Sequence, residues 1–328
     1  MATPTDNTTY YVPDQSKLPL ATAISISVAA YGAASGIHGL STEEGASWLT
    51  LIVGLLMIAA CLYVWFKETI VENSKNLHST QLKGSYRLGM QWFIFSEVMF
   101  FAAFFGALFY IKYLSMPWLA GEGEGGSENG RLLWEGYQNV WPSFWAWVGG
   151  ASDALVTPPT IPQEAVGGVA KQLVANNGEY VNAKVLGSPW KLPFLNTLLL
   201  VSSSFTVHWA HHAIKHDDAA KFKKWMIATL LLGLVFIGVQ GYEYYEAYHH
   251  LGLTLKSGVY GSTFFMLTGF HGFHVCMGAF ILLVQTIRGF KGHFKATDHF
   301  GFEAGSWYWH FVDVVWIFLF LVVYLNIF

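Results

Sequence analysis

The chain has 328 residues, of which 53% are hydrophobic and only 12% are charged, and its net charge at pH 7 is −3. This composition is too apolar and too poor in charge for a soluble domain, so the chain belongs in a lipid bilayer. The small negative charge gives no reason to expect a nucleic-acid partner. Residues 1–19 are polar and contain no apolar core with a cleavage site. We therefore expect no signal peptide, and the first helix must direct insertion.

Seven charge-poor runs are long enough to cross a membrane, because about 20 apolar residues at 1.5 Å each span a hydrocarbon core of roughly 30 Å. The first run is the weakest, since it is rich in Ala, Ser and Gly, but small residues suit close helix contacts in lipid. The runs cover residues 20–40, 49–66, 88–114, 193–214, 225–245, 258–287 and 304–327. The sequence therefore predicts an all-α polytopic membrane protein with seven transmembrane helices.

The distribution of Lys and Arg predicts the orientation of these helices. The short loops on one side of the membrane contain a single basic residue, Lys256. Because cytoplasmic loops are enriched in basic residues, we expect the N-terminus inside and the C-terminus outside. The basic residues assigned to the inside are Lys17, Lys67, Lys75, Lys83, Arg87, Lys215, Lys221, Lys223, Lys224, Arg288, Lys291 and Lys295.

The outer loop 115–192 interrupts the pattern of short connections. An acidic, glycine-rich turn and a proline-rich connector flank the stretch LLWEGYQNVWPSFWAWVGG. Aromatic rings of this kind suit the headgroup layer, where one edge of the ring can remain hydrated. We favour an interfacial helix or hairpin for this stretch over a re-entrant segment.

Glu97 is the most unusual ionisable residue in the predicted spans. It lies ten residues after Arg87, which places its carboxyl about 15 Å deep, near the bilayer midplane. A charge at this depth costs about 2.5 kcal/mol or more. We expect Glu97 to be protonated, to be hydrogen-bonded inside a bundle or to face a polar cavity. It is either a structural residue satisfied by a neighbouring helix or a proton-linked or lipid-linked site.

Other polar residues also fall within the predicted spans. His271 and His274 lie three residues apart near mid-depth, and His310 and Asp313 share a helix face. Together with glutamates near the outer end of the fifth span, these residues could build a metal site. Hydrogen bonds between helices explain each pair equally well in a setting without water.

The segment HWAHH at the inner end of the fourth span is the strongest candidate for a metal site. His208, His211 and His212 are three and four residues apart, so they could face one ion. Membrane desaturases and hydroxylases, however, need several such boxes on one side of the membrane, and the other histidines here lie at different depths. We expect no metal and no haem on this chain. An autonomous metal-dependent oxygenase or desaturase is the alternative, and a transporter with Glu97 as its proton relay is less favoured because no paired broken helices are evident.

Five stretches of the sequence resemble subunit III of the cytochrome c oxidases, in the same order and in matching helices. The resemblance covers nearly everything except the outer loop, and seven spans favour the cytochrome c branch over the five-helix subunits of quinol oxidases. The stretches are RLGMQWFIFSEVMFF, LPFLNTLLLVSSSFTVHWAHH, GYEYYEA, GVYGSTFFMLTGFHGFHV and HFGFEAGSWYWHFVDVVWIFLFLVVY.

The resemblance implies a subunit without redox centres, in a complex whose subunits I and II hold haem a and copper and receive electrons from cytochrome c. It implies a V of two and five helices with structural phospholipids in its cleft. The family's subunit supports proton uptake and protects the oxidase from inactivation during turnover. The expected organisation is an inner N-terminal tail, a two-helix bundle, an inner basic loop and a five-helix bundle that the outer loop interrupts, at residues 1–19, 20–66, 67–87, 88–328 and 115–192.

The resemblance also assigns roles to particular residues. The glutamate that reacts with carbodiimide in the family matches Glu97, and lipid contacts carry over to Trp65, His78 and Arg288, with Lys291 beside the last. An arginine can hold a lipid phosphate by two parallel hydrogen bonds. Two positions depart from the family: Gly106 replaces an aromatic residue that lines the lipid cleft, and Val71 replaces a basic one.

The resemblance implies a structural role, rather than metal binding, for the HWAHH segment. His208, His211 and His212 close the fourth helix at the inner interface, where they are expected to meet backbone carbonyls, lipid headgroups or subunit I. The enlarged outer loop resembles that of bacterial members. We therefore expect a bacterial inner membrane, with a cytoplasmic N-terminus and a periplasmic C-terminus.

Overall fold

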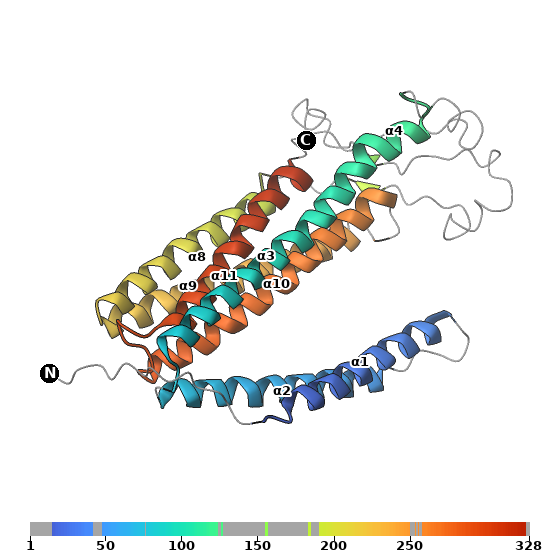
Figure 1. Cartoon of the computed structure of the whole chain (residues 1–328). Coiled ribbons are helices and arrows are strands. Elements are labelled where there is room, and N and C mark those ends of the chain that lie inside the picture. Colours follow the sequence, from blue (N-terminus) through green and yellow to red (C-terminus); the bar gives the residue numbers. More distant parts are fainter. Residues whose placement is uncertain are drawn as a thin grey trace. The chain divides into compact units, whose positions relative to one another are not determined.

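The computed structural model describes residues 15–41, 48–75, 77–123, 126, 155–156, 183–184, 190–249, 253, 255 and 258–325 (Figure 1). Two π-helical turns, η1 (Ile111–Ser115) and η2 (Phe320–Tyr324), extend α3 and α11, and the short α4 (Met116–Leu119) follows η1. Strands β1 (Leu155–Val156) and β2 (Ala183–Lys184) form a two-residue antiparallel pair. The long helices of the described chain are α1 (Leu18–Ser41), α2 (Leu49–Ser74), α3 (Thr80–Tyr110), α8 (Leu192–Lys215), α9 (Ala219–His249), α10 (Gly258–Phe290) and α11 (Phe300–Leu319).

Each predicted span corresponds to one long helix, which confirms the all-helical membrane class. Within the described residues, six of these helices are long and apolar enough to cross a membrane. The helix that falls short is α8, which carries the polar residues Asn196, Ser203 and Thr206. These side chains are buried against other helices, so their polarity lowers the hydropathy of α8 without exposing it to lipid.

The helices extend beyond the predicted spans. Helix α2 continues to Ser74 and α3 begins at Thr80, so most of the expected inner loop 67–87 is helical. Lys and Glu end an apolar run, but they are good helix formers, so the helix continues into the aqueous layer. The tryptophan-rich stretch for which we predicted an interfacial helix or hairpin lies outside the described residues.

The chain divides into two compact units, Met1–Gly89 and Met90–Phe328. In the first unit, α1 and α2 approach closely through glycines. A Cβ atom added at Gly32 would collide with the backbone nitrogen of Leu51, and one added at Gly54 would collide with that of Ala29. Small residues permit this close backbone approach, which favours helix association in lipid.

The second unit is centred on Trp309 of α11, which is 1% exposed. Its indole N–H donates a hydrogen bond to Ser203 Oγ on α8 at 2.8 Å. Its ring lies against Gly233 of α9 and Gly278 of α10, where an added Cβ would come within 2.9 Å of the ring at either position. A single side chain therefore contacts three neighbouring helices, and the two glycines provide the space for it.

Further hydrogen bonds join the helices of this unit. In membrane proteins each such bond contributes about 0.6 kcal/mol on average and up to about 1.7 kcal/mol. Two bonds link α8 to α9: Asn196 to Gln240 at 3.2 Å and Thr206 to Thr229 at 2.8 Å. One bond links α11 to α8, from Trp316 to Thr197 at 3.0 Å, and one links α9 to α10, between Tyr244 and Thr268 at 2.6 Å.

We predict that Gly278→Ala destabilises the protein, whereas Gly272→Ala on the same helix does not. The added methyl at position 278 would overlap the ring of Trp309, and such overpacking costs about 1–3 kcal/mol. A Cβ at position 272 meets nothing within 4 Å. Thermal unfolding in mild detergent measures the difference, and equal midpoints for the two variants would contradict the packing role of Trp309.

Candidate functional site

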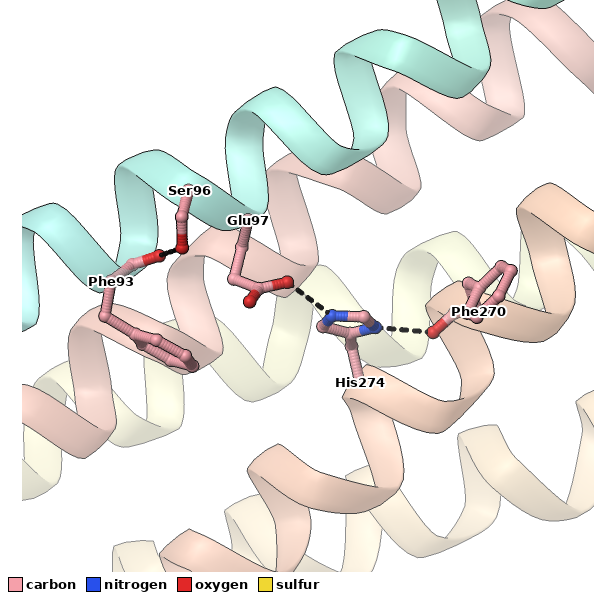
Figure 2. Close-up of polar contacts among 5 residues, drawn as sticks. All are labelled: Phe93, Ser96, Glu97, Phe270 and His274. Carbon is pink, nitrogen blue, oxygen red and sulfur yellow. Dashed lines mark hydrogen bonds and ion pairs between the residues drawn. The ribbon is translucent and has the colours of Figure 1, made fainter. Parts of the chain in front are cut away.

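The candidate site is a pair of ionisable side chains on α3 and α10 of the second unit. Figure 2 shows Glu97 and His274 facing each other, with His274 Nε2 2.9 Å from Glu97 Oε2. The other ring nitrogen, Nδ1, lies 2.6 Å from the backbone carbonyl of Phe270. We expected Glu97 to be protonated, to be hydrogen-bonded inside a bundle or to face a polar cavity. The structure shows the second of these, a hydrogen bond to a neighbouring helix.

The partners of His274 restrict where protons can lie. A carbonyl oxygen only accepts hydrogen bonds, so His274 Nδ1 carries a hydrogen and donates it to Phe270. The contact with Glu97 then contains one further proton, held either by His274 Nε2 or by the carboxyl. The first arrangement is an ion pair and the second is a neutral pair. The pair therefore has no net charge in either arrangement, which lowers the cost of placing it in a membrane.

Aromatic rings surround the histidine. The ring centroids of Phe101, Phe273 and Phe100 lie 5.0, 5.7 and 5.9 Å from that of His274, and the ring of Tyr308 is stacked at 6.5 Å. The His274 side chain is 9% exposed and that of Glu97 is 21% exposed. The histidine is thus enclosed by apolar groups, whereas the carboxylate keeps part of its surface accessible.

The other ionisable residues predicted within the spans, His271, His310 and Asp313, do not contact the Glu97–His274 pair through hydrogen bonds. His271 donates from Nε2 to the Val312 carbonyl at 3.1 Å, and His310 Nδ1 is hydrogen-bonded to Ser204 Oγ at 2.8 Å. Asp313 is 5% exposed, and neither carboxyl oxygen has a hydrogen-bond partner among the described residues. His310 and Asp313 share a helix as expected, but they are not hydrogen-bonded to each other.

The three histidines of the HWAHH segment do not converge. The ring of His211 packs against His299 and Phe302, with centroids 5.2 and 5.7 Å apart. His212 instead contacts His216, with the two Nε2 atoms 3.2 Å apart. Among the described residues, no group of three or more His, Cys, Asp or Glu side chains is placed to hold a metal ion. Sequence reasoning missed His216, although its four-residue spacing from His212 was a visible signal.

The residues expected to bind lipid lie in both units and differ in accessibility. Trp65 is 57% exposed, whereas the His78 side chain is only 5% exposed and lies 3.7 Å from Glu72. Arg288 donates to Gln285 Oε1 at 3.2 Å, and its guanidinium lies over the ring of Phe294. Lys291 is exposed in the turn after α10. The structure therefore leaves Trp65 and Lys291 the most accessible of the set.

A groove of about 460 Å³ lies within the second unit between α3, α10 and α11. Its lining is apolar over most of its length and includes Phe101, Ala102 and Phe318. Both π-helical turns contribute to one end, η1 through Lys112 and η2 through Val322. Along α3 and η1 the lining runs from Val98 to Tyr113, a distance of about 22 Å.

Together these features define a polytopic helical membrane protein in which Glu97 pairs with His274, and His271 is hydrogen-bonded to the backbone. Comparison with known proteins shows to which family of membrane proteins the chain belongs. The family model of cytochrome c oxidase subunit III matches residues 8–119 and 181–327.

Individual relatives agree over nearly the whole chain. It is 36% identical to "Cytochrome c oxidase subunit 3" of Arabidopsis thaliana over 316 residues, which covers 96% of this chain and 95% of the relative. It is 38% identical to the protein of the same name from Marchantia polymorpha, with the same coverage, and 34% identical to that of Cyprinus carpio, with 96% of each chain covered. The chain belongs to the cytochrome c oxidase subunit III family, a non-catalytic subunit of the oxidase, which confirms the resemblance noted in its sequence.

Proposed function

We propose that this chain is the lipid-binding, redox-inactive subunit III of an aa3-type cytochrome c oxidase. In this proposal subunits I and II hold haem a and copper, cytochrome c supplies the electrons, and this chain stabilises subunit I. The observation that carries the proposal is the Glu97–His274 pair, because the family's characteristic intramembrane glutamate here has a proton-sharing partner. The pair contains groups that can move a proton but none that can move an electron.

The histidines of the HWAHH segment make contacts in different directions, which favours this function over a metal-dependent oxygenase. An oxygenase centre needs several ligands directed at one metal position. His211 instead packs against an aromatic ring of α11, and His310 is hydrogen-bonded to α8. These histidines therefore support contacts between helices.

The groove of the second unit supports the proposed phospholipid binding. Its volume of about 460 Å³ lies within the range of roughly 300–1,000 Å³ found for ligand pockets. Its apolar lining suits an acyl chain, and the cationic Lys112 at one end suits a phosphate group. The proposed lipid contacts at Trp65, His78 and Arg288 rest on the family resemblance. Lys291 is added because it lies beside Arg288, and Glu97 because of its depth in the membrane.

The proposal includes a location and an arrangement. The excess of basic residues in one set of loops supports a cytoplasmic N-terminus and a periplasmic C-terminus, with α8 as the seventh span. A bacterial inner membrane is proposed from the enlarged outer loop. The V of two and five helices, with structural phospholipids in its cleft, is proposed from the family alone.

Purification of the chain from its native membrane through a tag, in mild detergent, tests the proposed complex. We expect the preparation to contain a-type haem, visible in its absorption spectrum, together with subunits I and II. Membranes from the untagged strain serve as the control. A preparation without haem a, in which the chain itself retained stoichiometric iron, would instead support the oxygenase.

The Glu97–His274 pair is proposed to support proton uptake and to protect the oxidase during turnover. We predict that Glu97→Ala and His274→Phe leave the haem spectrum unchanged but shorten the active lifetime of the purified oxidase severalfold. The double variant should be no worse than either single variant, because the two side chains share one proton and act as a unit.

Ser96→Ala is the matched control for this experiment. Ser96 neighbours Glu97, but its hydroxyl donates only to the Phe93 carbonyl of the same helix, as Figure 2 shows. We expect a wild-type lifetime for this variant. Unchanged lifetimes for Glu97→Ala and His274→Phe would reduce the pair to a packing contact.

Lipid binding in the groove can be tested separately. We predict that Ala102→Trp fills the groove and lowers the amount of phospholipid retained by the purified complex by about one molecule, measured by native mass spectrometry. Met99→Trp is the control, since Met99 is 55% exposed on the same helix and does not line the groove. Equal retention in both variants would show that no lipid occupies this position.

A further inference from the structure

The inner end of α8 contains a pair of histidines that the proposed function does not use. His212 lies in the last turn of α8, and His216 is the C-cap residue that follows the helix, four positions further on. Their ring centroids are 4.4 Å apart, and the two Nε2 atoms approach to 3.2 Å. Both residues are exposed. The geometry points to a site for an exchangeable transition-metal dication of the Zn²⁺, Ni²⁺ or Cu²⁺ class, held by His212 Nε2 and His216 Nε2.

The separation of the two nitrogens suits a shared metal ion. Zinc binds imidazole nitrogen at about 2.0–2.1 Å, and a tetrahedral angle then places two such nitrogens about 3.3 Å apart. The observed 3.2 Å is close to this distance, so little movement of either ring is needed. To bind the ion, both rings must present the lone pair of Nε2. The ring that now donates from Nε2 therefore moves its hydrogen to Nδ1 by exchange with water, so that each neutral ring carries its one hydrogen on Nδ1. Imidazole is a favoured ligand of these three metals.

The surroundings of the pair leave room for the rest of a coordination shell. The two histidines line a cavity of about 380 Å³ at the turn between α8 and α9, flanked by the rings of Trp209 and Trp225. These rings pack with centroids 4.6 Å apart and form a fixed wall. Because the described residues supply two ligands and no third, water would complete the shell, as it does at open metal sites.

A carboxylate lines the same cavity. Asp218 accepts a hydrogen bond from the backbone N–H of Lys221 at 3.0 Å and lies 2.9 Å from its ammonium group. As an aspartate, Asp218 carries a negative charge near neutral pH. Its negative charge favours a dication nearby, although Lys221 offsets part of it. Asp218 already caps the first turn of α9 by accepting the bond from the Lys221 N–H, which leaves the two histidines as the ligands.

The test counts zinc in the purified oxidase complex, isolated through a tag that contains no histidine. After equilibrium dialysis against micromolar ZnSO₄, we expect the wild type to hold one more zinc per complex than His212→Gln or His216→Gln. Zinc bound elsewhere in the complex cancels in this difference. Loss of a direct ligand should weaken binding by at least about tenfold, since even changes to outer-shell partners weaken metal binding by 10–100-fold.

His208→Gln is the matched control, because His208 is exposed on the same helix one turn before His212. This variant should retain the additional zinc. Equal zinc content in the wild type and in both pair variants would overturn the proposal, and so would loss of the ion in His208→Gln. Haem content of the same samples reports the proposed oxidase function separately, so failure of one does not imply failure of the other.

Discussion

The interior of a bilayer offers no water to a polar side chain, and this constraint governs the second unit of the protein. Trp309, Trp316 and Asn196 each reach a hydrogen-bond partner on another helix. The strongest case is the pair of Glu97 and His274, in which two ionisable groups remain electrically neutral as a unit. Each of these bonds joins two particular helices, so the need for partners helps to specify which helices pack together.

The spans could be predicted from the sequence because one physical quantity, apolar length, decides them. All seven predicted runs coincide with helices. Their ends could not be predicted in the same way, because the charge that ends an apolar run does not end a helix. Helix α2, for example, continues through Lys67 and Glu68 to Ser74. Helix α8 shows a second limit of hydropathy. Its buried polar residues face other helices but lower its mean hydropathy, so that it falls below the other six helices.

The candidate site could be predicted only in part. Depth along a helix follows from counting residues, so Glu97 and His274 could each be placed near mid-depth. Their contact depends on the rotation and separation of α3 and α10, and the two residues are 177 positions apart in the sequence. A single sequence contains no information on such a pairing. The rotation of side chains about one helix can be predicted more readily. Adjacent residues differ by about 100° at 3.6 residues per turn, which agrees with His211 contacting α11 while His212 contacts His216.

The protein thus contains two kinds of histidine environment with different physical capabilities. His274 is enclosed by rings, and moving its shared proton changes the dipole of the pair but not its net charge. Within the proposed oxidase, such a pair can act on a neighbouring subunit only over a short range, because a dipole's field falls faster with distance than that of a charge. His212 and His216 lie at an exposed helix end, where the proposed dication would bring its whole charge from solution. The proposed metal site would therefore add a charge at the end of α8, whereas moving the shared proton of the Glu97–His274 pair leaves the net charge of that pair unchanged.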